Sequence, residues 1–486
     1  MSNMKILGLN PPSIFTKNVA RDLLWGCWCK GRRIAGVQFP PLPLMYVGTV
    51  LKTRGHDVDI IDAQAEGISI PNIENKIKDY DIVFLISATM SYNEDSEMLA
   101  RLKKKNPHLI TIVFGAHPTF LPYEALKKES VDIIVRKEAE FIIRDLMDAL
   151  STGSDEWKKV LGIGYREDGK AILNPDYPYI ENLDELPIPD RNFLSNDIYY
   201  YNPIVKYFPW ATALSSRGCP GRCTFCTSPS YYGPKYRARS PENVVDEILY
   251  LKDLGFREIF YRDELFTLDK RMVMNICKII ITKKIDISWI CSVKANTTTY
   301  DMLKIMKEAG CRFIRVGVES GVQEILDSVK KDVKIEQIID TFYWAQKLKI
   351  ETHAHLMLGM PGETDRTISQ TFDFVKKIKP STVTYGIMTP YPGTEIYRQV
   401  LEIDPSFGDG THINAASIHT NASFSKAFTT LPQKKLEKYI RKGYLKFYMR
   451  LRYILERFLK VNDIDELRRL VLAGSQIFGF ITRGDE

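Results

Sequence analysis

Cysteine is scarce in this chain, with 8 residues among 486. A scaffold built on disulfides needs a far higher density, so that class of protein is excluded. No uninterrupted apolar run reaches the roughly 18 residues that a membrane-spanning helix needs. The first residues, MSNMKILGLNPPS, contain neither a basic segment nor a long apolar one, so we expect a first strand there and no signal peptide. These absences favour a soluble, cytoplasmic protein.

A basic surface spread over the whole chain is also lacking, although the formal net charge is +7. Residues 433–460 contain ten Lys or Arg and two Glu, so this segment alone carries +8. The rest of the chain is therefore nearly neutral, and we expect no nucleic-acid partner.

Residues 1–150 alternate short apolar runs with helical segments such as Leu44–Arg54 and Glu94–Lys105. This alternation predicts an α/β domain with a doubly wound, Rossmann-like parallel sheet, which binds ligands beyond the carboxyl ends of its strands. The expected strands are 4–9, 57–62, 81–87, 109–115 and 131–136. Residues 151–208, rich in Pro, Tyr, Asp and Asn, are expected to form an ordered connector.

A second series of strand and helix units is expected over residues 209–400. The expected strands are 211–217, 258–263, 288–295, 313–320, 351–359 and 382–388. Helical segments such as Pro241–Leu254 and Tyr300–Ala309 follow each strand except the last. Six units are too few to close the usual eight-stranded barrel, so we expect an open, partial TIM-like barrel. Residues 401–486 are expected to be helical after a loop at 405–425.

Cys219, Cys223 and Cys226 lie close together in the stretch SSRGCPGRCTFCTSPS. Structural zinc takes four ligands, and no further Cys or His follows nearby. A disulfide would leave one of the three thiols alone. A [4Fe–4S] cluster held by three thiolates leaves one iron open to an external ligand. The stretch follows the first expected barrel strand, on the face where such barrels place their active sites. Zinc binding and simple burial are the alternatives, and the spacing favours the cluster.

The spacing C-x3-C-x2-C, with the aromatic Phe225 before the last cysteine, resembles the signature of the radical S-adenosylmethionine (SAM) superfamily. The resemblance implies that SAM binds the open iron and is cleaved to a 5′-deoxyadenosyl radical, which abstracts hydrogen from the substrate. Further stretches similar to motifs of this family are RDELFT (262–267), VGVESG (316–321), LGMPGET (358–364) and PYPGT (390–394). The implied SAM-binding residues are Phe225, Asp263, Glu264, Lys294, Glu319, Ser320, Gly359 and Pro361.

Alternation along the strand WICSVKA separates the side chains of its two faces. If Lys294 points to the barrel mouth, Cys291 faces the outer helices. We therefore expect Cys291 to be buried as a small apolar residue, and the same of Cys277 and Cys311.

Three basic or titratable residues on the barrel strands are candidate catalytic residues, namely Lys294, Arg315 and His355. For Arg315 and His355 the sequence leaves two roles open, a substrate ligand or a hydrogen-bonded interior group.

A doubly wound domain ahead of such a barrel resembles the cobalamin-binding subclass of the family. The stretches 39–62, 115–120 (GAHPTF) and 184–191 (DELPIPDR) carry this resemblance. It implies a cobalamin site at Asn10, Pro11, Pro12, Pro41, Leu42, Ser87, Thr89, Gly115 and His117. The D-x-H-x-x-G motif that supplies an axial histidine in classical cobalamin proteins is absent, and the alternative is a domain that only shapes the substrate pocket. Cys27 and Cys29 are expected to be structural, with contact to substrate, cobalt or a redox centre as the alternative.

Apolar residues within 433–460 recur every three or four positions, which predicts one amphipathic helix. They are Leu436, Ile440, Tyr444, Phe447, Leu451, Ile454, Leu455 and Phe458. This helix is expected either to pack on the barrel with a solvated basic side or to lie peripherally on an anionic membrane.

The stretch 223–248 is most similar to the cyclitol ether synthases of hopanoid and archaeal lipids, such as calditol synthase. The resemblance implies ring formation or carbon–carbon rearrangement on a lipid-linked or other hydrophobic substrate, with a reductant such as flavodoxin or ferredoxin. The alternatives are a cobalamin-dependent C-methyltransferase and a tetrapyrrole ring cyclase. A cobalamin or iron sensor without catalysis would leave the SAM motifs unexplained.

Overall fold

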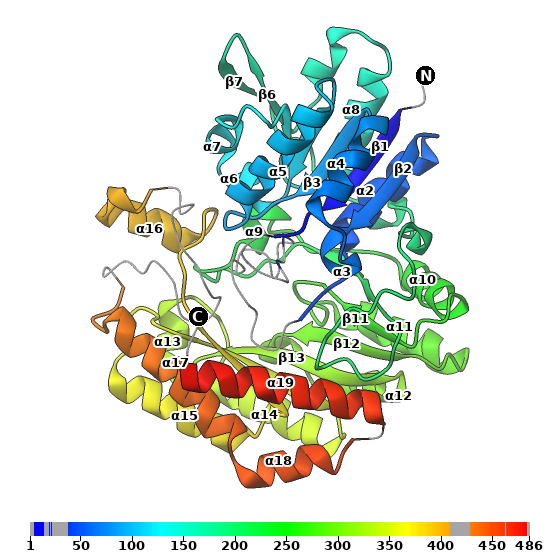
Figure 1. The fold of residues 1–486 in the computed structure, drawn as a ribbon. Helices are drawn as coiled ribbons and strands as arrows, with labels where there is room; N and C mark the ends of the chain where they lie inside the picture. Colours follow the sequence, from blue (N-terminus) through cyan, green and yellow to red (C-terminus); the bar gives the residue numbers. More distant parts are fainter. Residues whose placement is uncertain are drawn as a thin grey trace.

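The computed structural model describes residues 4–13, 19, 21, 37–408, 428–461 and 463–483. Two sheets dominate it, a mostly parallel one in the N-terminal domain and a parallel one in the barrel, with helices at the C-terminus (Figure 1). Cys27, Cys29 and most of the loop expected at 405–425 lie outside the described residues.

The N-terminal sheet has seven strands in the order β2-β1-β3-β4-β5-β6-β7. Five strands run parallel and confirm the predicted doubly wound sheet: β1 (Lys5–Asn10), β2 (Asp57–Asp62), β3 (Ile82–Ile86), β4 (Ile110–Phe114) and β5 (Ile133–Val135). The strands β6 (Ile163–Glu167) and β7 (Lys170–Leu173) form an antiparallel hairpin at its edge. The expected connector therefore begins with two strands that extend this sheet.

Helices cover both faces of this sheet because its strands are apolar on both sides. The helices α2 (Leu42–Thr53) and α8 (Ala139–Leu150) pack on one face. On the other face lie α4 (Ile70–Lys76), α5 (Tyr92–Lys105) and α7 (Pro122–Leu126). The strand order reverses between β1 and β3, which makes the carboxyl ends of these strands the expected ligand-binding crevice.

The barrel sheet has six strands that follow one another in chain order, as predicted. They are β8 (Trp210–Ala213), β11 (Glu258–Tyr261), β12 (Ser288–Val293), β13 (Cys311–Glu319), β14 (Glu351–Leu358) and β15 (Thr382–Ile387). The longer helices between them are α10 (Pro241–Asp253), α11 (Lys270–Thr282), α12 (Tyr300–Glu308), α14 (Ile335–Lys347) and α15 (Asp365–Ile378). A helix also follows the last strand, α16 (Glu395–Ile403), where the sequence predicted none. Side chains such as Ser240, Asp269 and Thr364 cap these helices by accepting hydrogen bonds from first-turn N–H groups.

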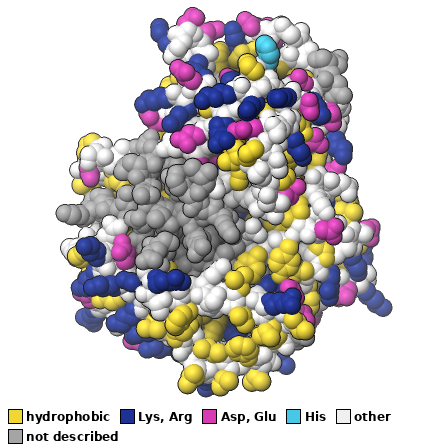
Figure 2. All heavy atoms as spheres, in the orientation of Figure 1, with side chains coloured by type: hydrophobic (Ala, Val, Ile, Leu, Met, Phe, Trp, Pro, Cys, Tyr) yellow, Lys and Arg dark blue, Asp and Glu magenta, His cyan; other side chains and the backbone are white. Residues whose placement is uncertain are grey.

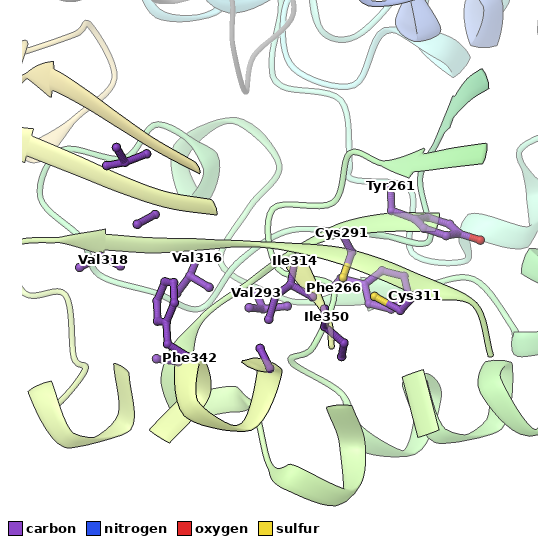
Figure 3. Close-up of a cluster of buried hydrophobic side chains, with 14 of the residues drawn as sticks. Tyr261, Phe266, Cys291, Val293, Cys311, Ile314, Val316, Val318, Phe342 and Ile350 are labelled. Carbon is purple, nitrogen blue, oxygen red and sulfur yellow. The ribbon is translucent and has the colours of Figure 1, made fainter. Parts of the chain in front are cut away.

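The outer face of the barrel sheet packs on these helices and forms the largest apolar core of the described chain. Cys277, Cys291 and Cys311 are buried in this core, which confirms the expectation for all three. Cys291 and Cys311 lie beside Tyr261 and Phe266 between sheet and helices (Figure 3). Because Cys291 faces outward, Ser292 and Lys294 belong to the inner face of the strand.

Residues 433–460 form two helices, α17 (Gln433–Tyr448) and α18 (Leu451–Phe458), and not the single helix expected. The break lets both Tyr448 and Tyr453 reach the strand β15, where they bond to Val383 and to the carbonyl of Ser381. In a straight helix two residues five positions apart would point in different directions. The last helix, α19 (Ile464–Arg483), packs against α17. Within the described ranges, no helix is long and apolar enough to cross a membrane.

Candidate active site

The carboxyl ends of the two sheets face each other, and loops from both domains meet there (Figure 1). Phe120, after β4, contacts the ring of Tyr231 in the cysteine-bearing loop, with 6.2 Å between ring centroids. The Tyr391 hydroxyl, after β15, donates to the sulfur of Met90, which follows β3. The loops at both expected ligand-binding faces therefore contact each other.

The three-cysteine loop follows a short strand, β9 (Ser216–Arg217), which pairs with β10 (Arg237–Ala238). Gly218 begins the loop with a φ of +84°, and a Cβ atom there would lie 2.1 Å from the carbonyl oxygen of Lys235. The Cys219 N–H donates to Gly233, and the Cys226 N–H donates to Cys223. These backbone bonds hold the loop in a defined form, and its three half-buried thiols form no disulfide.

The thiols suit a multi-iron cluster better than a single ion. Among the residues that the structure describes, no three His, Cys, Asp or Glu side chains converge on a point that could hold one metal ion. Thiolates that each bind a different iron need no such convergence. Burial, with the neighbouring Cys223, raises the pKa of Cys226 to about 12. Cationic iron would offset the cost of ionising these buried thiols. The donor set thus fits a [4Fe–4S] cluster.

Asp263 and Glu264 follow β11 and point in different directions. The buried Asp263 carboxylate accepts hydrogen bonds from the Ser215 N–H and from the hydroxyls of Ser215 and Ser216. It therefore anchors the chain just before the cysteine loop. One oxygen of Glu264, Oε2, is shielded from solvent and has no hydrogen-bond partner among the described residues. Burial, with the charge of Asp263 added, raises the pKa of Glu264 to about 8.

Glu264 and Lys294 both lie near the sulfur of Cys219. Burial raises the pKa of this thiol, and the charges of Glu264 and Lys294 act on it in opposite directions. With a pKa of about 8, the Glu264 carboxyl is largely protonated at neutral pH. A ligand ammonium group, which the methionine part of SAM would provide, would favour its ionised form and give Oε2 a hydrogen-bond partner.

We expect Glu264→Gln to weaken SAM binding by about tenfold to a hundredfold, because a charge-assisted hydrogen bond would be lost. Equilibrium dialysis of labelled SAM against the protein reconstituted with iron and sulfide measures the dissociation constant. The control is Glu324→Gln on α13 (Gln323–Ser328), where the carboxylate is exposed. An unchanged constant in Glu264→Gln would contradict the assignment.

Glu319 ends β13 in the left-handed region, at a φ of +60°. Its carboxylate pairs at 2.7 Å with the ammonium of Lys331, a buried residue that the sequence analysis missed. The Lys331 ammonium lies 5.8 Å from the ring centroid of Phe225. Burial alone would lower the pKa of Lys331, but Glu319 and the thiols of Cys223 and Cys226 raise it. A buried cation thus stands beside the cysteines. Its sequence signal is weak, because Lys331 lies in the charged surface-like run VKKDVK.

Other residues predicted to bind SAM hold the shape of the barrel mouth. The Ser320 hydroxyl is buried, contacts Thr371 of α15 and accepts from the N–H of Val322. In the turn after β14, the N–H groups of Gly359 and Met360 donate to Glu363, whose pKa burial raises to about 7. The carbonyl of Pro361 in the same turn accepts from Ser328. Phe225 packs on Met357, Met360 and Met388.

The inner face of the barrel carries an aromatic floor beneath a polar layer. The floor is formed by Phe39, Trp210, Phe260, Ile290 and Phe313. In the polar layer, Arg315 contacts Ser292 and the Nε2 atom of His355, and the Nδ1 atom of His355 contacts Thr384. Burial lowers the pKa of Arg315, and the nearby Arg262 adds to this effect. The structure thus brings Arg315 and His355 together inside the barrel, while Lys294 lies nearer the cysteines.

The predicted cobalamin residues fall at the carboxyl ends of β1 to β4, in two groups. Asn10 and Pro41 line a small cavity of about 50 Å³ at the ends of β1 and β2, the predicted crevice. Pro11, Pro12 and Leu42 adjoin these two residues along the chain. The sequence analysis missed Asp62 and Tyr200 in the same cavity, where Asp62 accepts from the Asn10 amide and the Tyr200 hydroxyl. Burial raises the pKa of Asp62 to about 6.

The second group follows β3 and β4. Ser87 donates to Asp95 of α5, Thr89 is buried, and His117 stacks on Tyr92 with ring centroids 3.9 Å apart. Gly115 has a φ of +110°, and a Cβ atom there would lie 2.6 Å from the carbonyl oxygen of Ser87. These residues fix the loops that face the barrel, and the contacts of Ser87 and His117 with α5 give them a packing role.

A buried ion network joins the N-terminal domain to the cysteine-bearing strand pair. Arg217 of β9 pairs with Glu138 and Glu140 at the start of α8, and Arg237 of β10 pairs with Glu138 at 2.8 Å. All four side chains are at most 7% exposed. Burial opposes the charge of Arg217, but the two glutamates outweigh it and hold its pKa above the usual value. The network holds the start of α8 against the strands β9 and β10, which flank the cysteine loop in the sequence.

Comparisons with known proteins agree with this geometry. The family model described as the radical SAM superfamily matches residues 214–375, and that of the B12 binding domain matches residues 33–146. An uncharacterized methyltransferase of Pyrococcus horikoshii is 32% identical over 437 residues, which cover 87% of this chain and 91% of that protein. The anaerobic magnesium-protoporphyrin IX monomethyl ester cyclase of Rubrivivax gelatinosus is 30% identical, with 76% and 68% covered.

Among solved structures, the radical SAM methyltransferase TsrM of Kitasatospora setae, with cobalamin and a [4Fe–4S] cluster bound, superimposes with a TM-score of 0.68. The alignment covers 83% of this chain and 78% of that one at 16% sequence identity. At this identity the likeness is one of fold.

Proposed function

Because this chain belongs to the radical SAM superfamily and carries a B12-binding domain, we propose that it transfers a methyl group to a carbon atom of its substrate. Its cofactors are a [4Fe–4S] cluster, SAM and cobalamin. The main supporting observation is that loops at the carboxyl ends of both sheets contact each other, close in the chain to the three cysteines. The relative from Pyrococcus horikoshii, named as a methyltransferase, supports the same reaction class.

The protein residues have separate tasks in this proposal. Cys219, Cys223 and Cys226 hold the cluster, and Glu264 holds the ammonium group of SAM. Asn10 and the crevice at β1 and β2 contribute to the cobalamin site. When bound, the cluster with SAM supplies a hydrogen-abstracting radical, and cobalamin supplies a methyl group.

Inside the barrel, Arg315 and His355 would orient the substrate over the aromatic floor. Like-charge repulsion from Arg262 and burial both disfavour the charge on Arg315. An anionic group on the substrate would relieve this cost. The cationic polar layer above an aromatic floor therefore favours a substrate with one anionic and one apolar part, such as a carboxylate or phosphate on a carbon skeleton.

The test is anaerobic reconstitution of the full chain with iron, sulfide, hydroxocobalamin and SAM carrying a trideuteromethyl group, followed by incubation with metabolite and lipid extracts. Mass spectrometry should detect 5′-deoxyadenosine, S-adenosylhomocysteine and a product with the labelled methyl group. Arg315→Gln should still form up to one equivalent of S-adenosylhomocysteine per bound cobalamin but lower labelled product about a hundredfold, because a buried charged contact to substrate is lost. Formation of 5′-deoxyadenosine without S-adenosylhomocysteine would contradict methyl transfer.

That contrary result would favour ring formation, the second candidate. It is supported by the 30% identity to the Rubrivivax gelatinosus cyclase. The lipid-linked, cyclitol-forming substrate expected from residues 223–248 remains a prediction within this second candidate. An anionic lipid headgroup would satisfy the same polar layer as a free metabolite, and lipid extracts in the assay separate the two sources.

A further inference from the structure

The helix α18 turns its apolar side away from the protein. Leu451, Leu455, Phe458 and the following Leu459 recur at helical spacing on one side, and they are 79%, 62%, 52% and 85% exposed. The opposite side faces inward with Tyr453, Ile454 and Arg457 half-buried, and Arg457 pairs there with Glu351 at 2.9 Å. No residue of α18 is buried. A helix that packs normally on a protein shows the reverse arrangement.

The exposed apolar surface continues along α19. Ile464, Val471 and Leu472 are 71%, 55% and 45% exposed. Figure 2 shows apolar side chains gathered on the lower face of the molecule, over α18 and α19, with Lys and Arg side chains beside them. We call this surface the apolar patch; its members are Leu451, Leu455, Phe458, Leu459, Ile464, Val471 and Leu472. Scattered exposed apolar residues are ordinary, but a contiguous patch of this kind marks an interaction site.

The charge around the apolar patch favours one kind of partner. The segment 433–460 carries +8, and most of this charge lies on α17, which contacts α18. Residues 451–472, which span the patch itself, contain five Lys or Arg and four Asp or Glu. Arg452 is 90% exposed on α18 itself, and Lys460 follows the helix as an exposed residue. A second copy of this chain docked here would bring the two basic α17 helices close together, which costs free energy. An anionic bilayer offers both an apolar phase and complementary charge.

We propose that the apolar patch docks peripherally on an anionic lipid bilayer, with α18 at the interface. The patch differs from the membrane-facing helix expected from the sequence, because Leu436, Ile440, Tyr444 and Phe447 of α17 are buried against the rest of the protein. Docking involves α18 and α19 only. The inference does not depend on methyl transfer.

The docking face lies away from the cysteine loop. Residues of α18 bind Glu351 and the carbonyl of Ser381, at the amino ends of β14 and β15. Cys219, Cys223 and Cys226 lie at the carboxyl end of the barrel strands. A bilayer against α18 therefore lies at the opposite end of the barrel strands from the cysteine loop.

The experiment is flotation of the full-length chain with vesicles of phosphatidylglycerol and phosphatidylcholine, compared with phosphatidylcholine alone. We expect binding to the anionic vesicles and much weaker binding to the neutral ones. The triple variant Leu455→Ser/Phe458→Ser/Leu459→Ser should lower the partition coefficient by at least about a hundredfold, since three large apolar side chains no longer enter the interface. The matched control, Tyr343→Ser/Ile403→Ser, removes side chains that are 53% and 63% exposed elsewhere and should bind as the native chain does.

A second variant tests the electrostatic part. Arg452→Gln/Lys460→Gln should lower binding to anionic vesicles by about tenfold or more at low salt, and the difference should shrink as salt is raised. All these positions are exposed, so the variants should keep the native melting temperature.

Absence of vesicle binding, or equal binding by the native chain and the triple variant, would overturn the proposal. A native dimer that the triple variant converts to a monomer in light scattering would identify the patch as a self-association surface and would also overturn it.

Discussion

Cys223→Ala is expected to abolish the visible absorbance of the iron–sulfur cluster and the formation of 5′-deoxyadenosine together. Each of the three cysteines would bind a different iron, so the loss of one thiolate leaves that iron without its protein ligand. Cys219→Ala and Cys226→Ala should behave in the same way. The measurement is the absorbance spectrum after anaerobic reconstitution, with mass spectrometry of the SAM products from the same sample.

The matched control for this prediction is Cys291→Ala. That thiol is buried in the outer core beside Cys311 and faces away from the barrel interior (Figure 3). The Cys291→Ala substitution should lower the stability of the protein somewhat and leave both cluster absorbance and SAM cleavage intact. SAM cleavage that persists in Cys223→Ala would refute the assignment of the cluster to this loop.

Arg217→Met is expected to destabilise the protein by about 3–5 kcal/mol. Glu138 and Glu140 are buried, and the substitution would remove Arg217, the residue of β9 that pairs with both of their charges. Arg237 still reaches Glu138 but makes no ion pair with Glu140 within the described part of the chain. Because Arg217 lies two positions before Cys219, we also expect a lower yield of reconstituted cluster. Chemical denaturation followed by fluorescence measures the loss.

Lys52→Met is the control for the interdomain network. Lys52 pairs with Asp190 at 2.6 Å and likewise links α2 to a later segment, but its side chain is 55% exposed. An exposed pair of this kind contributes no more than about 1 kcal/mol. Adding Glu140→Gln to Arg217→Met should restore part of the stability, since one unpaired charge is removed. If Arg217→Met costs no more than Lys52→Met, the buried network has no special role in joining the domains.

Within each domain, the sequence was a good guide to the fold. Apolar alternation located the six barrel strands and the five parallel strands of the N-terminal sheet to within a few residues, because hydrogen bonding and side-chain periodicity act over neighbouring positions. The hairpin of β6 and β7 was missed, since its strands are only five and four residues long and begin a segment rich in Pro, Tyr, Asp and Asn. The break between α17 and α18 was missed for a different reason, since it depends on tyrosine contacts with β15.

For the site, the sequence by itself determined the three cysteines and the order of the motifs, because their chemistry is written in short contiguous stretches. The tertiary structure alone decided which side chains share a space. In the folded chain the Asp263 carboxylate binds Ser215, and the Glu264 carboxyl lies near Cys219. The Lys331 ammonium lies beside the ring of Phe225. The apolar side of α18 faces outward. These outcomes depend on packing between segments far apart in the chain, which neither spacing nor periodicity records.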